Sequence, residues 1–180
     1  MHSEVQREYG GALWELCAEE NCAAEMRADV LSVLSVLRSE ADYIRLLSSP
    51  NIPAEERLAL LDEAFRGKVH AYLLNFLKLL CERGHASCIC GCLEEFCRRY
   101  DEAYRIENVT VWSAVELTKA QKDALGQKLS EKLQKNVRLT AKIDPSLLGG
   151  VRVQTQNESF DGSVLGKMET IRHDLIQTVI

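Results

Sequence analysis

Hydrophobic positions recur every three to four residues along the first part of the chain. From Glu4 to Glu19 they form one stripe, which predicts an amphipathic helix that stops at Asn21. The same period returns in five later segments, at about 26–37, 43–47, 53–66, 68–83 and 86–104. Six helices with short connections and no strand pattern predict an all-α bundle.

The fifth predicted helix, Lys68–Arg83, is the most apolar of the six. At about 100° per residue, its hydrophobic side chains cover well over half of the circumference and leave a narrow polar strip. One neighbouring helix cannot cover so wide an arc. The helix therefore either lies at the centre of the bundle or keeps part of its face for a partner chain. Gly84 follows it as a C-terminal cap, because glycine adopts a positive φ at little steric cost.

The hydrophobic period changes from 3.6 to 2 after Arg105. Asn108–Val115 and Val137–Ile143 alternate apolar and polar residues, as strands with one buried face do. Between them, Thr118 and Gln121 have the spacing of a capping box, which predicts the start of a helix. The buried row of this helix is expected to be Leu125, Leu129 and Leu133.

The following stretch holds a dense series of backbone signals. Asp144-Pro145 ends the second strand, Gly149-Gly150 permits a tight turn, and Val151–Val153 resumes the sheet. A last helix is predicted from the spacing of Val164, Met168, Ile171 and Leu175. The sequence thus predicts an α + (α+β) chain: an N-terminal six-helix bundle over residues 1–105, then a small C-terminal β-α-β-β-α domain over 106–180.

Composition and charge favour a folded, two-domain protein. Of the 180 residues, 46% are hydrophobic and 27% are charged, as in ordinary globular proteins. The net charge of -5 comes from residues 1–105, whereas 106–180 is close to neutral; this weighs against nonspecific nucleic-acid binding. No window approaches the roughly 18 apolar residues of a membrane-spanning helix, and the polar, partly acidic start is unlike a signal or transit peptide. We expect a cytosol-like compartment and no transmembrane segment of the chain's own.

A cluster of cysteines is the most tempting candidate for chemistry. Five of the seven cysteines lie close together, with His85 nearby: Cys81, Cys88, Cys90, Cys92 and Cys97. Zinc favours these ligands, but Cys-x-Cys-x-Cys on a helix directs the thiols around it and matches no closed site. We therefore interpret the cysteines as small apolar residues. The alternative, a metal-binding or redox protein, would be supported by stoichiometric zinc or by thiol titration.

No other motif indicates catalysis, a cofactor or nucleic-acid binding. Gly162–Met168 has three residues between its glycines and Met after Lys167, unlike a phosphate-binding loop. The four histidines are scattered; His70 and His173 are expected on solvated helix faces. The Lys-rich side of the helix at 119–135 lacks interleaved aromatic residues, so a nucleic-acid adaptor is a weaker alternative, and salt-dependent DNA binding is not expected. We predict no catalytic residue, no metal and no cofactor.

The sequence resembles a known family over essentially the whole chain, most specifically in three regions. Ile143-Asp-Pro-Ser-Leu-Leu-Gly-Gly-Val-Arg-Val153, with the glycines and lysine that follow, closely resembles the C-terminal signature of the ATP synthase delta subunit, the bacterial equivalent of the mitochondrial oligomycin-sensitivity-conferring protein. Tyr9–Leu16 is similar to the family's opening helix, and Phe76–Gly84 to its fifth helix. The signature positions are Asp144, Pro145, Gly149, Gly150, Asp161, Gly162 and Gly166.

The resemblance implies a noncatalytic stator subunit in the peripheral stalk of F-type ATP synthase. By resemblance, domain 1–105 binds the catalytic head by holding the N-terminal helix of an α subunit between its first and fifth helices. Domain 106–180 receives the C-terminal end of the b-type stalk, and the protein lies peripherally at the cytoplasmic face of the cell (inner) membrane. The residues expected to line the α-subunit groove are Tyr9, Ala12, Leu13, Phe76, Leu79, Leu80 and Arg83.

Overall fold

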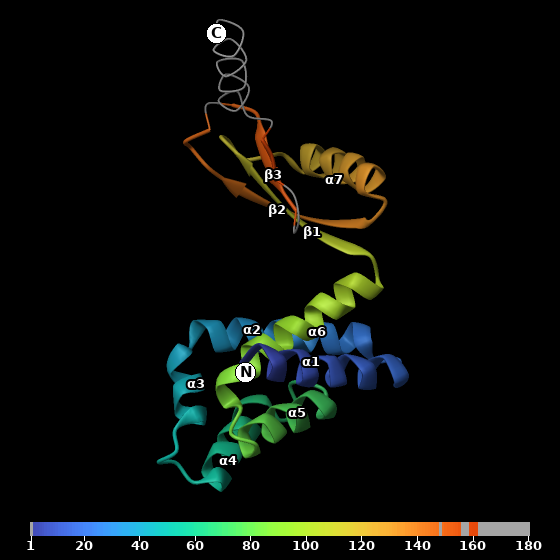
Figure 1. Ribbon diagram of the computed structural model, residues 1–180. Coiled ribbons are helices and arrows are strands. Elements are labelled where there is room, and N and C mark those ends of the chain that lie inside the picture. Colours follow the sequence, from blue (N-terminus) through green and yellow to red (C-terminus); the bar gives the residue numbers. More distant parts are fainter. Residues whose placement is uncertain (1, 148, 156–158, 162–180) are drawn as a thin grey trace, which may run out of the picture. The chain divides into compact units, whose positions relative to one another are not determined.

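The computed structural model divides into two compact units, Met1–Glu102 and Ala103–Ile180. It describes residues 2–147, 149–155 and 159–161 (Figure 1). The first unit is helical and the second contains a small sheet, which confirms the predicted fold class in these broad terms. Within the described residues, no helix is both long and apolar enough to cross a membrane.

The first unit is built from helices joined by short turns (Figure 1). Its elements are α1 (His2–Glu19), α2 (Ala23–Ser39), α3 (Ala41–Ser48), α4 (Ala54–Phe65), α5 (Ala71–Glu82), the 3-10 turn η1 (Ala86–Cys88) and α6 (Ile89–Ala103). Their apolar faces meet in one core, in which Met26, Leu77 and Phe96 are fully buried. Asn21 and Gly84 end α1 and α5 with positive φ angles of 56° and 75°, as the sequence predicts.

Two helix starts differ from the sequence prediction. The fifth helix starts at Ala71 rather than Lys68 because His70 acts as its N-cap: the His70 Nδ1 accepts from the Tyr72 amide at 3.3 Å. The His70 amide donates to Asp29 at 2.7 Å, and His70 is a half-buried residue at the helix start rather than a residue on a solvated helix face. The predicted helix at 86–104 is preceded by η1, and α6 itself starts at Ile89.

Helices α1 and α6 pack closely because glycines lie between them. A Cβ on Gly10 would lie 2.5 Å from the Cys92 carbonyl oxygen. A Cβ on Gly91 would lie 2.2 Å from the Gln6 side chain. Separations below about 3 Å are not tolerated between non-bonded atoms, so a larger residue at position 10 would push the two helices apart, whereas the flexible Gln6 side chain could move away from a Cβ at position 91.

The second unit contains a four-stranded sheet and α7. Its elements are β1 (Ile106–Ser113), α7 (Lys119–Leu133), β2 (Asn136–Ile143), β3 (Val151–Gln154) and β4 (Ser159–Asp161). The strand order is β2-β1-β3-β4; β1 and β2 are parallel, and the other two pairs are antiparallel. The βαβ connection places α7 along one face of the sheet (Figure 1), where Val109 and Val111 are buried with Leu125 and Leu129 packed on them.

Two local features that the sequence predicts in this unit, a capping box and a turn after β2, form in the structure. The predicted capping box forms: Thr118 accepts from the Gln121 amide at 3.3 Å, and the Gln121 side chain accepts from the Thr118 amide at 2.9 Å. At the end of β2, Asp144 Oδ1 accepts from the Ser146 amide at 3.0 Å and from its hydroxyl at 2.6 Å. These two hydrogen bonds lower the pKa of Asp144 and hold the turn that contains Pro145.

The second unit differs from the sequence prediction in two features, and part of the prediction lies outside the described residues. Val115 does not continue β1; it follows the strand and is 70% exposed. The short strand β4, which contains the signature residue Asp161, was not predicted and adds an edge to the sheet. Gly150 has φ 80° before β3 as expected, whereas Gly162, Gly166 and the predicted last helix lie outside the described residues.

The α1–α6 contact predicts the effect of adding a single methyl group. Gly10→Ala should lower the free energy of unfolding by about 1–3 kcal/mol, because the new Cβ overpacks the contact with the Cys92 carbonyl. The matched control is Gly126→Ala in α7, where a Cβ meets nothing within 4 Å. The control should be neutral or stabilising by up to about 1 kcal/mol. Urea unfolding followed by circular dichroism measures both, and an equal effect of the two changes would contradict this packing.

Candidate docking groove

An apolar groove of about 340 Å³ lies between α1 and α5. It is lined by Tyr9, Ala12, Leu13 and Leu16 from α1, and by Tyr72, Asn75, Phe76 and Leu79 from α5. Each set follows the same spacing, i, i+3, i+4 and i+7, which places the four residues on one side of a helix. Each wall therefore extends about 10 Å along its helix.

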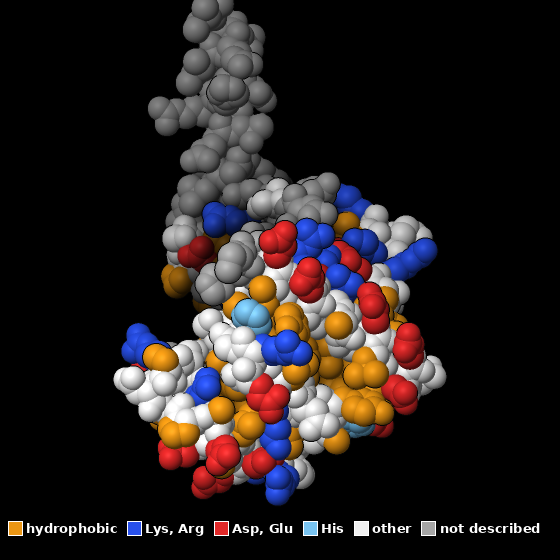
Figure 2. Space-filling model, turned by 60° about the horizontal axis from the view of Figure 1, so that its bottom comes forward, with side chains coloured by type: hydrophobic (Ala, Val, Ile, Leu, Met, Phe, Trp, Pro, Cys, Tyr) orange, Lys and Arg blue, Asp and Glu red, His pale blue; other side chains and the backbone are white. Residues whose placement is uncertain are grey.

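Apolar side chains remain exposed in this groove. Leu16 and Leu79 are 38% and 40% exposed, whereas Leu13 and Phe76 are buried and form the floor. Figure 2 brings forward the side of the helical unit on which α4 and α5 lie in Figure 1, and apolar side chains gather there between charged ones. Exposed apolar surface of this kind is typical of an interaction site.

The structure brings together five of the seven residues predicted to line the groove. They are Tyr9, Ala12, Leu13, Phe76 and Leu79. Leu80 is fully buried in the core and does not line the groove. Arg83 follows α5 as its C-cap, is exposed, and is not among the lining residues. The prediction missed Leu16, Tyr72 and Asn75. Leu16 is the i+7 position from Tyr9, whereas Tyr72 and Asn75 follow only when Tyr72, rather than Phe76, is taken as the first position of the stripe on α5.

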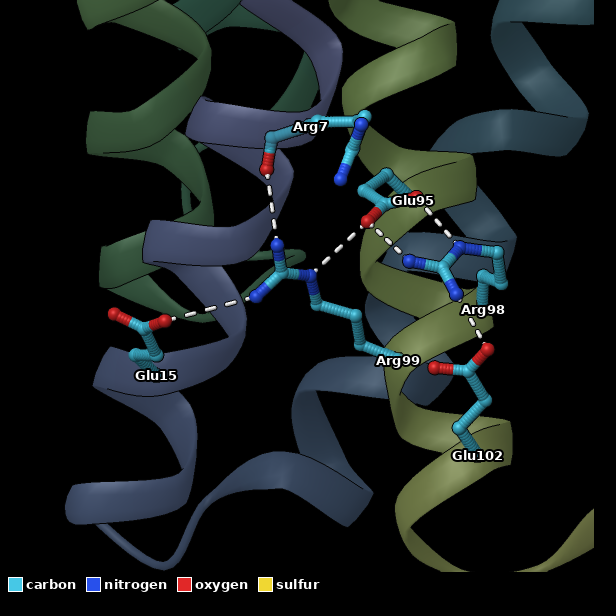
Figure 3. A network of polar contacts seen from close by, with 6 residues as sticks. All are labelled: Arg7, Glu15, Glu95, Arg98, Arg99 and Glu102. Carbon is cyan, nitrogen blue, oxygen red and sulfur yellow. Dashed lines mark hydrogen bonds and ion pairs between the residues drawn. The ribbon is translucent and has the colours of Figure 1, made fainter. Parts of the chain in front are cut away.

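A network of ion pairs holds α1 against α6 behind the groove (Figure 3). The Arg99 guanidinium donates to the Arg7 carbonyl at 3.3 Å and to Glu95 at 3.0 Å, and lies 3.6 Å from Glu15. Gly11 leaves room for this guanidinium, since a Cβ there would lie 2.6 Å from it. The network and the glycine contact together set the position of α1, and hence of one wall of the groove.

Glu95 is the central carboxylate of this network. Its side chain is only 10% exposed and accepts from Arg98 at 2.6 and 2.7 Å as well as from Arg99. Hydrogen bonds from Arg98, and then from Arg99, lower the pKa of Glu95 despite its partial burial. The ionised carboxylate therefore stabilises the folded state.

The cysteines form no candidate site in this unit. All seven are thiols, and Cys17, Cys81, Cys88 and Cys92 are buried in the core. Burial raises the pKa of the Cys92 thiol to about 12 and that of Cys81 to about 11. The thiolate is the form that binds metals or attacks, so these thiols are poorly suited to either role. Among the residues described, no group of three or more His, Cys, Asp or Glu side chains could hold a metal ion.

Fold and groove together define a two-unit chain whose candidate site offers apolar contact surface rather than paired acids, bases or ligands. Comparison with known proteins gives the family. The family model described as ATP synthase delta (OSCP) subunit matches residues 5–175. The chain belongs to the ATP synthase delta (OSCP) subunit family.

Individual relatives agree along nearly the whole chain. ATP synthase subunit delta of Chlorobaculum tepidum is 32% identical over 172 residues, covering 96% of this chain and 95% of the relative. That of Brevibacillus brevis is 30% identical over 170 residues, covering 94% and 97%. A chain of the mitochondrial ATP synthase hexamer of Toxoplasma gondii shares the fold, with a TM-score of 0.71, 16% identity and coverage of 95% and 97%. The protein is thus a noncatalytic subunit of the ATP synthase peripheral stalk.

The lowered pKa of Glu95 predicts a pH-dependent stability. A lowered folded-state pKa gives stabilisation that is full above the ordinary Glu value of about 4.3 and is lost as the pH falls below it. Wild type should therefore be more stable than Glu95→Gln at pH 7, and this difference should shrink as the pH falls toward about 3.

Urea unfolding at a series of pH values measures this difference. The control is Glu116→Gln, because Glu116 is exposed and forms no ion pair within the described part of the chain. A difference between wild type and Glu95→Gln that stays constant across this pH range would contradict the role assigned to the network.

Proposed function

We propose that the α1–α5 groove holds the N-terminal helix of an ATP synthase α subunit and so joins the stalk to the catalytic head. The observation that carries this proposal is the pair of matching apolar stripes, one on each wall, with Leu16 and Leu79 left exposed. An amphipathic helix with its own i, i+3, i+4, i+7 stripe would fill the space between them. Asn75 is the one side-chain amide among the lining residues and can orient such a helix by a hydrogen bond.

A helix fits this groove better than a small molecule does. The lining residues are almost all apolar and offer few convergent polar groups of the kind that fix a cofactor or substrate. The lining residues of each wall span about two helical turns, which matches the repeat of an amphipathic helix. Docking would cover the exposed parts of Leu16 and Leu79, and burial of apolar surface favours association by about 25 cal/mol per Å².

The second unit is proposed to receive the C-terminal end of the b-type stalk subunit. Support comes from exposed apolar residues at one end of the sheet: Val115 is 70% exposed and Ile143 is 58% exposed. Ile143 pairs with Ser113 in the sheet, and Ser113 donates to the Val115 carbonyl at 2.6 Å, so these residues lie at the same end of the sheet. With both contacts made, the subunit would lie peripherally at the cytoplasmic face of the membrane, linking the head to the stalk during proton-driven rotary ATP synthesis.

The groove predicts the effect of one added charge. Ala12 is exposed and lines the groove, so Ala12→Asp should leave the helical unit folded but bury a carboxylate against the apolar stripe of the docked helix, where it loses its water. Such a charge costs roughly 1–3 kcal/mol or more, so affinity for a synthetic peptide of the α-subunit N-terminus should fall about 10- to 100-fold. Isothermal titration calorimetry measures the affinity, and circular dichroism checks the fold.

Ala59→Asp is the matched control for this change. Ala59 is also exposed on a helix, α4, but lies outside the groove lining, so the same added charge should leave peptide affinity unchanged. Equal affinities of Ala12→Asp, Ala59→Asp and wild type, or no binding of the peptide to wild type, would contradict the proposed docking site.

A further inference from the structure

We infer that the helix docked in the groove carries positively charged side chains along the edge that faces α1. This inference rests on the proposed function of the groove as a helix-docking site and adds the charge of the partner. It is argued from the carboxylates beside the apolar stripe of α1, from the charge at the end of α1, and from the residues of the opposite wall. Two of the carboxylates, Glu8 and Glu19, have no cationic partner among the described residues.

An acidic stripe runs beside the apolar stripe of α1. The stripe consists of positions 8, 12, 15 and 19, which lie within about 60° of one another on the helix at 100° per residue. Ala12 belongs both to this stripe and to the lining of the groove. Three of these positions are exposed glutamates: Glu8, Glu15 and Glu19. Glu8 and Glu19 are eleven residues apart, so their attachment points are separated by about 16 Å along the helix.

The glutamates of this stripe differ in their partners. Glu15 lies 3.6 Å from the Arg99 guanidinium, which reaches toward it from α6 (Figure 3), so its charge is partly offset within the protein. Neither Glu8 nor Glu19 forms an ion pair within the described residues. These two carboxylates therefore remain available to a partner at the two ends of the groove wall.

The charge at the end of α1 opposes the helix dipole. The last turn of α1 contains Glu19 and no basic residue, and Glu20 follows directly. A helix C-terminus carries a partial negative charge, which favours basic rather than acidic side chains by about 0.3–1 kcal/mol each. A cation from the docked helix would offset this unfavourable concentration of negative charge.

None of the residues that line the groove from the opposite wall is cationic. On α5, Asn75 is neutral, and the Lys78 ammonium is held by Asp62 of α4 at 2.6 Å. Glu82 is exposed and adds another carboxylate near the end of α5, and Arg83 beyond it forms no ion pair within the described ranges. The groove is thus apolar along its floor and predominantly acidic along the α1 edge, which fits an amphipathic helix with Lys or Arg beside its apolar stripe.

Two synthetic helical peptides test this inference. Both carry the same leucine stripe; one has two lysines eleven residues apart beside the stripe, and the other has glutamine at those positions. Calorimetry with the full-length protein compares wild type, the double variant Glu8→Gln/Glu19→Gln and the control Glu116→Gln/Glu131→Gln. The control removes two exposed carboxylates from the second unit.

The lysine peptide should bind wild type about 3- to 10-fold more tightly than the glutamine peptide at low salt, the range expected for two exposed ion pairs. This preference should shrink as salt is raised, disappear in Glu8→Gln/Glu19→Gln and persist in the control. Equal binding of both peptides to wild type would overturn the charge inference and leave the groove as a docking site. If neither peptide bound, the docking site and the inference would fail together.

Discussion

The close contact between α1 and α6 is the constraint on which the groove depends. Gly10 lets the two backbones approach, and Gly11 leaves room for the Arg99 guanidinium, which then holds the Arg7 carbonyl and Glu95. With one side of α1 fixed in this way, its stripe from Tyr9 to Leu16 lines the groove opposite α5. Stability of the unit and exposure of the stripe therefore have the same structural cause.

Helix α5 serves both the core and the surface. Leu73, Leu77 and Leu80 are fully buried, whereas Leu79 is only partly covered and faces the groove with Asn75. The exposed apolar surface lowers the solubility of the isolated chain, and a helix that covered it would remove this surface from water. This arrangement suits the proposed docking of a helix: apolar area would be buried on attachment, and the charged residues that border it would direct the helix.

Sequence patterns predicted what depends on neighbouring residues along the chain. The capping box at Thr118, the end of α5 at Gly84 and the alternation of β1 follow from local rules. The wide apolar arc of α5 left two interpretations open, a central position in the bundle or a surface for a partner. The pattern could not separate Leu79 from Leu80, because both belong to that arc and only the packing of neighbouring helices decides which is covered. Similarly, the capping role of His70 depends on its own tertiary contact with Asp29, and the three-residue strand β4 is too short for its period to be recognised.

The central claim is that the α1–α5 groove contacts the α-subunit N-terminus in the assembled ATP synthase. Site-specific photo-crosslinking tests it most directly: a photoreactive amino acid is placed at position 75 in the groove or, as a control, at position 59 on α4, and crosslinked peptides are identified by mass spectrometry in the purified complex. Crosslinks from position 75 to the first residues of an α subunit, with none from position 59, are the predicted result. Crosslinks from position 75 only to other subunits, or none from it in a fully assembled complex, would contradict the account.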